Sequence, residues 1–263
     1  VVIGGAVTFV NPEPLAMFAD VIAAGEGEAL VPALVEAMAS SSRSEQLTRL
    51  AQARGYYIPS FYDVDYAADG TIARYVPREG TGAPPVVRKA ALKTTEAVDP
   101  PSTTTSTPDT EFGSRFLIGE VRGCANLCRF CWAGYNYLPV RAFPTERILS
   151  LAQAARAHSS KAGLVSIALC DHPDIEHILR SLRDMGYSIS PASLRLDDLT
   201  PTIVSILKES GERTLTIAPE TGSDRLRRVI NKTVTNAEIL DSAELIFSSG
   251  IESRGSPQMR NLL

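Results

Sequence analysis

Three of the four cysteines of this chain lie in one short segment with the spacing C-x3-C-x2-C: Cys124, Cys128 and Cys131. Three thiolates on one loop can bind three irons of a cubane iron–sulfur cluster. Such clusters usually take four cysteines, so one iron would stay open to another molecule. The spacing therefore predicts a cluster that does chemistry at its open iron.

Zinc and disulfide bonds are the alternative uses of these cysteines. A structural zinc site usually takes four ligands in two pairs, and no second pair is present, because His158 and His172 lie far downstream. A disulfide is less expected because no secretory signal precedes the cysteines. The fourth cysteine, Cys170, ends an apolar run, where we expect a buried structural thiol.

The segment resembles the hallmark of the radical S-adenosylmethionine (SAM) superfamily, C-x3-C-x-aromatic-C, with Phe130 in the aromatic place. In that family the open iron binds SAM, and an electron from the cluster cleaves SAM to a 5′-deoxyadenosyl radical. The resemblance implies an iron–sulfur enzyme with a [4Fe-4S] cluster and SAM as cofactors. It also implies an electron donor such as a flavodoxin or ferredoxin, and it makes the three cysteines the metal ligands.

The composition limits the class of protein. With 263 residues, of which 44% are hydrophobic, the chain can bury a sizeable core. No apolar stretch approaches the roughly 20 residues that span a bilayer, and the chain does not start with a signal peptide. We therefore expect a cytoplasmic protein without membrane contact. The formal charge of −4 gives no strong nucleic-acid signal.

Residues 1–54 are predicted to form half of a doubly wound α/β domain. Short apolar runs lead into Gly4-Gly5 and Gly25, a short helix is expected from Leu15 to near Asp20, and helical period follows from Ala29 to Ala39. This stretch resembles the C-terminal half of the Rossmann-like cobalamin-binding domain that precedes the radical SAM domain in one group of these enzymes.

The resemblance also bears on cobalamin. Gly4 and Gly5 match by position a glycine pair near the nucleotide tail of the cofactor, whereas the Asp-x-His-x-x-Gly motif that supplies the cobalt ligand has no match. A Gly-Gly pair after a strand is equally a plain tight turn. Cobalamin is thus a possible cofactor by resemblance, and the missing motif argues against its binding to this chain.

Residues 55–110 are predicted to be a β-hairpin insert followed by a Pro/Ser/Thr-rich linker. Asp69-Gly70 stands between tyrosine-rich alternating runs, which is typical of a hairpin turn. The tyrosines favour ordinary hairpin packing over stacking on nucleic acid. From about Glu79 to Thr110 we expect a linker that buries little.

Residues 111–263 are predicted to form a partial parallel (β/α) barrel of radical SAM type, incomplete at its C-terminus. Hydrophobic strands alternate with amphipathic helices, and in such barrels the functional residues follow the strands. The predicted strands are 115–121, 164–169, 187–194 and 213–218, and the predicted helices are 144–158, 175–185, 201–209, 224–230 and 236–249.

Polar residues follow three of these strands. The stretches containing Ser193 and Arg195 and containing Glu220, together with Ile230-Asn231-Lys232, resemble motifs of the cobalamin-type radical SAM group. The resemblance makes Ser193, Arg195 and Glu220 candidates to bind SAM, with arginine suited to its carboxylate and glutamate to its ribose or amine. The alternative is an internal Arg195–Glu220 ion pair across the barrel mouth.

Asp171 and His172 follow another predicted strand. Asp171 stands where many radical SAM enzymes hold the SAM amine, but a helix cap is its more expected role. His172 could act as an acid or base near neutral pH, although a loop histidine of this kind is more often solvated.

The chain looks cut at both ends. Too few strands follow the cysteine loop for a full barrel, and residues 251–263 show no buried strand, so an edge would lie open. Our leading hypothesis is a radical SAM enzyme of unknown substrate, with methyl transfer as one reaction that the domain resemblance suggests. The alternatives are a cluster-binding scaffold without catalysis and, less expected, a zinc-binding module.

Overall fold

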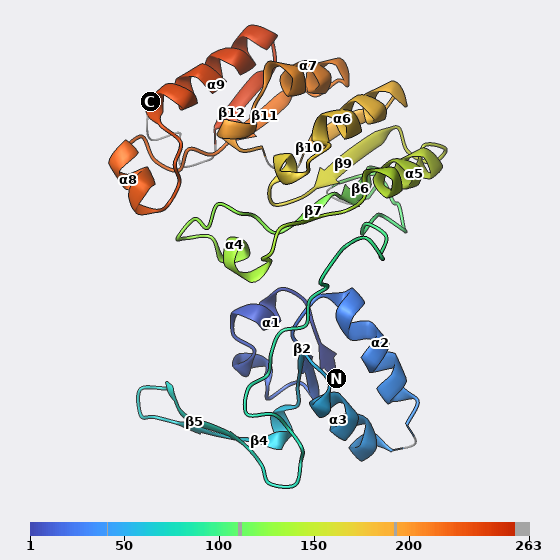
Figure 1. Ribbon diagram of the computed structural model, residues 1–263, viewed down its shortest axis with the longest axis vertical. Coiled ribbons are helices and arrows are strands. Elements are labelled where there is room, and N and C mark those ends of the chain that lie inside the picture. The colour runs from blue at the N-terminus through green and yellow to red at the C-terminus, as the bar shows by residue number, and fades with distance from the viewer. Residues whose placement is uncertain (41, 110–111, 192–193, 256–263) are drawn as a thin grey trace. The chain divides into compact units, whose positions relative to one another are not determined.

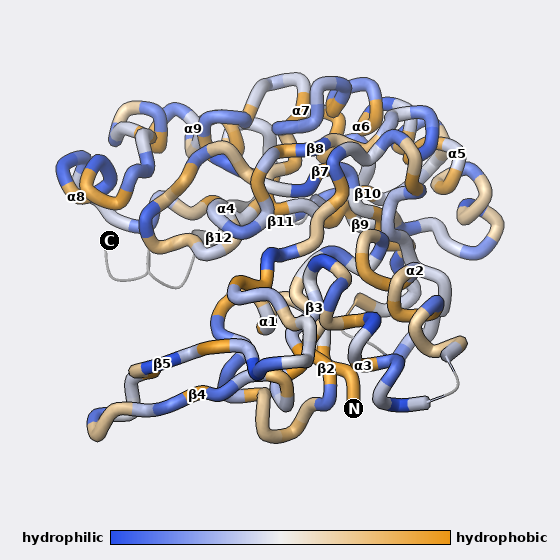
Figure 2. Tube along the Cα trace, turned by 60° about the horizontal axis from the view of Figure 1, so that its bottom comes forward, coloured by the Kyte–Doolittle hydropathy of each residue, from blue (hydrophilic) through white to orange (hydrophobic). Residues whose placement is uncertain are grey.

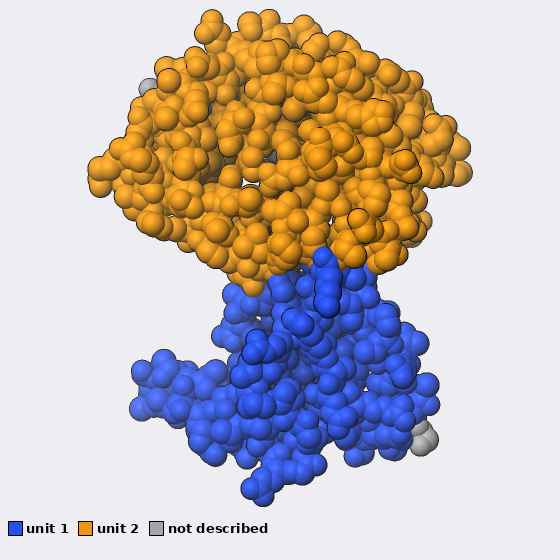
Figure 3. Space-filling model, viewed as in Figure 1, with its two compact units in different colours: residues 1–93 blue, residues 94–263 orange. Residues whose placement is uncertain are grey.

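The structure of the chain, a computed structural model, describes residues 1–40, 42–109, 112–191 and 194–255. Two compact units make up the chain, unit 1 with Val1–Lys93 and unit 2 with Thr94–Leu263 (Figure 3). Each has hydrophobic clusters of its own. Within the described ranges, no helix is long and apolar enough to cross a membrane.

Unit 1 contains a three-stranded sheet in the order β1-β2-β3. β1 and β2 are parallel, as predicted, whereas β3 runs antiparallel to β2. The elements of the unit are β1 (Val2–Ile3), α1 (Val7–Val10), a 3-10 turn (Glu13–Leu15), β2 (Val21–Ala23), α2 (Gly27–Met38), α3 (Arg43–Gln52), β3 (Tyr56–Tyr57), a 3-10 turn (Pro59–Phe61), β4 (Tyr62–Tyr66) and β5 (Ile72–Pro77) (Figure 1).

Two predictions for the first 54 residues were incorrect. The helix expected from Leu15 to near Asp20 is absent. The 3-10 turn Glu13–Leu15, with Pro14 in its first turn, ends where that helix was expected to begin, and residues 16–18 form a turn. Helix α3 was missed. Its start carries the usual signal, because the Ser42 side chain accepts a hydrogen bond from the backbone of Glu45 (3.2 Å).

The hairpin was predicted correctly. β4 and β5 are antiparallel, and Asp69 closes the turn by accepting hydrogen bonds from the backbone N–H and hydroxyl of Thr71. Hydrophilic and hydrophobic residues are mixed along both strands (Figure 2). The tyrosines pack on one another, with Tyr62 and Tyr75 stacked at 4.6 Å between ring centroids. Packing is therefore their observed use.

Unit 2 contains a parallel three-stranded sheet, β10-β9-β6, and a parallel pair, β11-β12. Together these strands form a partial parallel barrel. Its elements are β6 (Phe116–Gly119), β7 (Val121–Arg122), α4 (Trp132–Asn136), β8 (Arg141–Ala142), α5 (Thr145–Ala155), β9 (Lys161–Val165), a 3-10 turn (Leu169–Asp171), α6 (Ile175–Asp184), β10 (Ser188–Pro191), a 3-10 turn (Leu196–Asp198), α7 (Pro201–Glu209), β11 (Thr214–Ile217), α8 (Asp224–Val229), α9 (Asn236–Ser249) and β12 (Glu252–Gly255).

Helices α5, α6, α7 and α9 lie along one side of the strands (Figure 1). They pack against strand residues in one continuous core. Helix α6 illustrates the reason, since Ile178, Leu179 and Leu182 recur at helical spacing and are fully buried. Burial of this stripe fixes the helices on the sheet and leaves the strand ends to form the site.

Three expectations for unit 2 need correction. Strand β9 ends at Val165, and Leu169 lies in a buried 3-10 turn, because an apolar run alone does not separate a strand from another buried segment. A strand does follow Gly250, since β12 pairs in parallel with β11. The linker also buries residues, as Thr95 is 3% exposed and Thr103 N–H donates to the Leu117 carbonyl of β6 (2.9 Å).

Candidate functional site

The cysteine loop begins directly after β7 at Gly123, whose φ is +92°. A Cβ atom added there would lie 2.7 Å from the Tyr137 carbonyl oxygen and 3.1 Å from that of Pro139. Both neighbours are backbone atoms, which cannot give way cheaply. Glycine at this position therefore sets the direction in which the chain enters the loop at Cys124.

Gly123→Ala is expected to displace the loop. The positive φ alone costs an alanine about 1–2 kcal/mol, and the backbone clash adds to it. We expect a lower melting temperature and fewer irons bound per chain after reconstitution, measured by thermal unfolding and iron analysis. Gly113→Ala is the control, because it also has a positive φ (+58°) but nothing lies within 4 Å of the added Cβ. Equal iron uptake by both variants would contradict the expectation.

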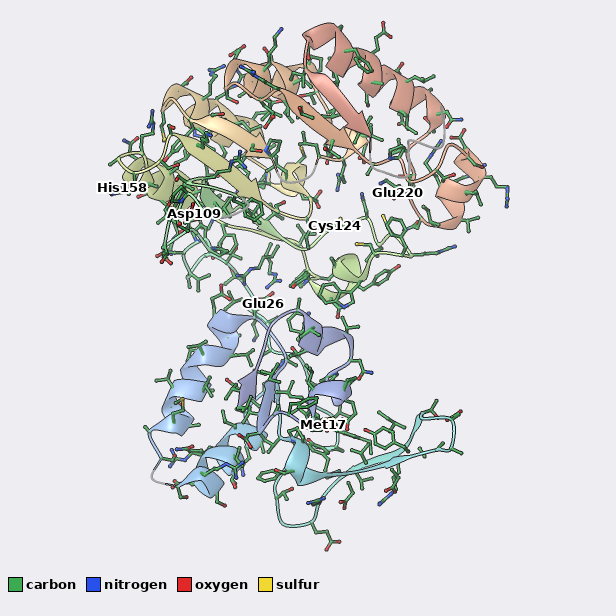
Figure 4. The ribbon with its side chains drawn as sticks, turned by 180° about the vertical axis from the view of Figure 1, so that it is seen from behind. Met17, Glu26, Asp109, Cys124, His158 and Glu220 are labelled. Atoms are coloured by element: carbon green, nitrogen blue, oxygen red, sulfur yellow. The ribbon has the colours of Figure 1, made fainter. Side chains whose placement is uncertain are left out.

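The three cysteines of the loop line one cavity of about 230 Å³. Asn126 and Phe130 of the same loop also line it. The rest of the lining comes from the segments that follow three parallel strands: Ile167 after β9, residues 194–197 after β10, and Ala218, Glu220 and residues 232–234 after β11. Cys124 and Glu220 lie on the same side of unit 2, with His158 far from both (Figure 4). The structure thus gathers at one place what the sequence distributes over more than 100 residues.

The donor set fits an iron–sulfur cluster. All four cysteines are free thiols of intermediate exposure. Among the residues that the structure describes, no three side chains of His, Cys, Asp or Glu converge as ligands of one metal ion would. A cubane relaxes that demand, because each thiolate meets a different iron, whereas one zinc needs every sulfur at about 2.3 Å. Burial raises the pKa of Cys128, and the charge of Lys232 partly opposes this.

Hydrogen bonds attach the loop to the segment after α8. They run between residues about 100 positions apart: Arg129 N–H to the Ile230 carbonyl (2.9 Å), Arg129 Nη1 to the Val229 carbonyl (2.6 Å), and Asn231 Nδ2 to the carbonyls of Asn126 (2.9 Å) and Leu127 (3.0 Å). The segment after α8 is itself held by Arg227, which is fully buried and donates to the Val234 carbonyl (2.6 Å) and to Asn236 (2.5 Å).

Glu220 forms an ion pair with Lys232, with 2.9 Å between Oε1 and Nζ. Lys232 also donates to the Ala218 carbonyl. Glu220 has a positive φ of 65°, so its backbone holds a conformation that a non-glycine residue rarely adopts. The pair places one negative and one positive side chain on the cavity wall. The alternative considered from the sequence, an Arg195–Glu220 ion pair, is not the arrangement found.

Arg195 lines the same cavity and is surrounded by carboxylates. Its Nη1 lies 2.8 Å from Asp171, and its Nη2 lies 2.8 Å from Asp198. The nearest approach to Asp197 is 3.5 Å. Burial disfavours the charged guanidinium, but the charges of Asp198 and its neighbours outweigh this and raise the pKa of Arg195. For Asp198, burial is the largest influence, and it raises the pKa of this carboxyl group.

The remaining predicted site residues have different outcomes. Phe130 lines the cavity and is 55% exposed. Ser193 lies outside the described residues. Lys232 and Asn231 were quoted only as part of a motif and were missed as site residues. The Ile230-Asn231-Lys232 motif was the sequence signal that could have identified them, because it contains both residues.

Asp171 and His172 have structural partners. Asp171 does not cap α6, because it is paired with Arg195. His172 is 2% exposed, so the expectation of a solvated ring was incorrect. Its Nδ1 accepts from the Asp174 N–H (3.0 Å), which leaves Nε2 as the donor to the Phe143 carbonyl (2.8 Å). Cys170 is partly buried beside the core, and burial raises the pKa of its thiol to about 12.

A partial parallel barrel with this cysteine loop at its strand ends defines a radical SAM protein. The chain belongs to this superfamily, since the family model described as "Radical SAM superfamily" matches residues 121–258, more than half of the chain. A second family model, "Radical SAM proteins, N-terminal", matches residues 1–59.

Individual relatives were also found. An uncharacterized protein of Methanocaldococcus jannaschii, MJ0966, is 37% identical over 143 residues, which cover 54% of this chain and 32% of that protein. The match thus spans about a third of the relative.

Two solved structures share the fold over 97% of this chain. The methyltransferase TsrM from Kitasatospora setae, with cobalamin and a [4Fe-4S] cluster bound, has a TM-score of 0.64 at 13% identity. The cobalamin-dependent radical enzyme OxsB, with aqua-cobalamin and SAM bound, has a TM-score of 0.61 at 14% identity. The chain covers 49% and 35% of these proteins, respectively.

Proposed function

We propose that this chain carries the cofactor site of an enzyme that cleaves SAM reductively at a [4Fe-4S] cluster. The observation that carries the proposal is the shared cavity, in which Cys124, Cys128 and Cys131 face residues from the ends of three parallel strands. The cluster, when bound, would supply an electron to SAM and so give a 5′-deoxyadenosyl radical. The work of the chain is to hold both cofactors and to limit the access of water.

Glu220 and Lys232 are proposed to contact SAM. Both line the cavity, and their 2.9 Å ion pair keeps them oriented without a ligand. A carboxylate suits the amine or ribose hydroxyls of SAM, and an ammonium suits its carboxylate. Phe130, beside the last cysteine of the loop, is proposed to pack against the cofactors, and we keep Ser193 as a candidate from its motif alone.

Arg195 is also proposed to bind the SAM carboxylate, provided that one of its present aspartate partners is displaced. Its two Nη atoms already donate to Asp171 and Asp198. A second carboxylate would therefore compete with one of these aspartates. Burial raises the pKa of Asp198, which favours its protonation and so the release of the guanidinium to a second carboxylate.

For the step after radical formation we propose a reaction class only, and the substrate stays unidentified. TsrM is named a methyltransferase, and the fold it shares with this chain supports methyl transfer as one candidate reaction. All three histidines lie in unit 2, at 158, 172 and 177, so a cobalamin held by unit 1 would receive no imidazole from the described part of this unit. A low-potential donor of the flavodoxin or ferredoxin type and a reducing, cytoplasmic setting suit a cluster held by free thiolates.

Anaerobic reconstitution with iron and sulfide tests the proposal. We expect a brown protein with about four irons per chain, and 5′-deoxyadenosine formed from SAM under reduction. A cluster without 5′-deoxyadenosine would favour the scaffold alternative. A colourless protein with stoichiometric zinc would reject the proposal.

A further inference from the structure

The backbone is unusual at three places in or beside the cavity wall. Among the described residues, the non-glycine residues with a positive φ are Leu127 (49°), Asn231 (58°) and Glu220 (65°). Leu127 lies in the cysteine loop. Glu220 and Asn231 lie before and after α8, in the stretch of chain that follows β11. Such conformations persist only where the surroundings hold them, and they concentrate at functional sites.

Asn231 connects these segments through its side chain. Its Nδ2 donates to the carbonyl oxygens of Asn126 (2.9 Å) and Leu127 (3.0 Å), so both amide hydrogens have acceptors. The two carbonyls belong to the stretch between the first and second cysteines, and Leu127 directly precedes Cys128. Asparagine is among the few non-glycine residues that tolerate a left-handed backbone. Asparagine at position 231 therefore suits both the two hydrogen bonds to the loop and the left-handed backbone.

A purely local role for Asn231 does not account for these contacts. A residue that only ended α8 would do so through its backbone and would need no side-chain contact outside that helix. The contacts of Asn231 reach residues 104 and 105 positions away instead. The backbone N–H of Arg129 adds a parallel link to the Ile230 carbonyl (2.9 Å).

We propose that Asn231 is a positioning residue for the cluster. Its carboxamide fixes the peptide before Cys128 and so holds the loop in a cluster-ready form before iron binds. The proposal rests on the cysteines being cluster ligands, as proposed above. The segment after α8 then holds the cysteine loop in place. Lys232, which is proposed to contact SAM, is the next residue of that segment, so its position depends on the same contacts.

Two substitutions separate the hydrogen bonds from the backbone conformation. Asn231→Asp keeps the size of the side chain but replaces the donor with an oxygen that faces two carbonyls. Asn231→Gly keeps the left-handed φ and removes the side chain. Arg228→Gln is the control, because it changes the net charge by the same one unit at an exposed position of α8 outside the cavity lining and leaves both carbonyl acceptors and Asn231 in place.

The first measurement is made on the chain before reconstitution. We expect the Arg129 amide to exchange with deuterium about tenfold faster in both Asn231 variants. At about 1 kcal/mol per hydrogen bond, one lost bond corresponds to about fivefold and two to about thirtyfold. Amides of β9 serve as an internal reference for folding. The second measurement is the rate of iron loss from the reconstituted protein to a chelator, which we also expect to rise about tenfold.

The outcomes are distinguishable. Faster exchange together with faster iron loss in both variants, with Arg228→Gln like wild type, supports the proposal. Unchanged Arg129 exchange overturns it, as does faster exchange with unchanged iron loss. If the wild-type chain takes up no cluster, the proposed function fails, and with it the positioning role, whatever the exchange of the loop shows.

Discussion

Replacing Cys128 with alanine is expected to abolish both cluster assembly and 5′-deoxyadenosine formation. Two remaining thiolates leave a second iron of the cubane without a protein ligand, and such clusters usually depend on all of their cysteines. Cys128 is the most informative of the three, because its neighbours are tied to the segment after α8. Activity should fall to the background of the assay.

Cys170→Ala supplies the matched control. This cysteine packs beside the core of unit 2 rather than in the loop, and its Sγ lies 3.9 Å from the Asp198 carbonyl oxygen. We expect it to keep the iron content and activity of the wild type. Iron and sulfide analysis, the visible spectrum and chromatography of the SAM products provide the measurements. Loss of the cluster in Cys170→Ala, or its retention in Cys128→Ala, would count against the assignment.

Glu120→Gln is expected to change how stability depends on pH. Glu120 lies between β6 and β7 and is 0% exposed. Neither carboxyl oxygen has a hydrogen-bond partner within the described ranges. Burial without a compensating partner disfavours the carboxylate and raises the pKa of Glu120 to about 8.

The sign follows from proton binding. Between the ordinary pKa near 4.5 and the folded-state pKa of about 8, the folded chain keeps a proton that the unfolded chain has released. The free energy of unfolding therefore falls as the pH rises through this window. The shift corresponds to a loss of roughly 5 kcal/mol by pH 8. Below pH 4.5 the group contributes no such loss.

Glutamine at position 120 stays neutral at every pH. We expect the variant to match the wild type near pH 5 and to be several kcal/mol more stable near pH 9, measured by denaturant unfolding across the range. Glu244→Gln, at an exposed position of α9, is the control and should follow the wild-type profile. Parallel profiles of Glu120→Gln and wild type would show that the carboxyl is solvated or paired.

Local features were predictable from the sequence. The cysteine loop spans eight residues, so its ligand spacing is a property of the chain itself. The bounds of α7 and α9 were predicted correctly because their caps are local. Thr200 accepts from the Ile203 N–H, Thr235 and Glu238 form a capping box, and Gly250 ends α9 with a φ of 80°.

The distant pairings of unit 2 were not predictable. Strand β12 lies in a polar segment, yet it pairs with β11, because the hydrogen bonds of a sheet depend on the partner strand and only partly on side chains. The alternative that paired Arg195 with Glu220 was wrong for a similar reason. Which carboxylates approach a guanidinium depends on which strand ends meet.

The sequence by itself determined the signature of the superfamily, through three thiols at a fixed spacing and an aromatic residue beside the last one. Only the tertiary structure decided how the cysteine loop is supported. Asn231 donates to the Asn126 carbonyl of the loop, and Arg129 of the loop donates to the Val229 carbonyl, each across about 100 residues of chain. The physical reason is that a short loop encodes its own ligand spacing locally, whereas the groups that hold it come together only when the parallel strands pack and bring their carboxyl ends to one edge.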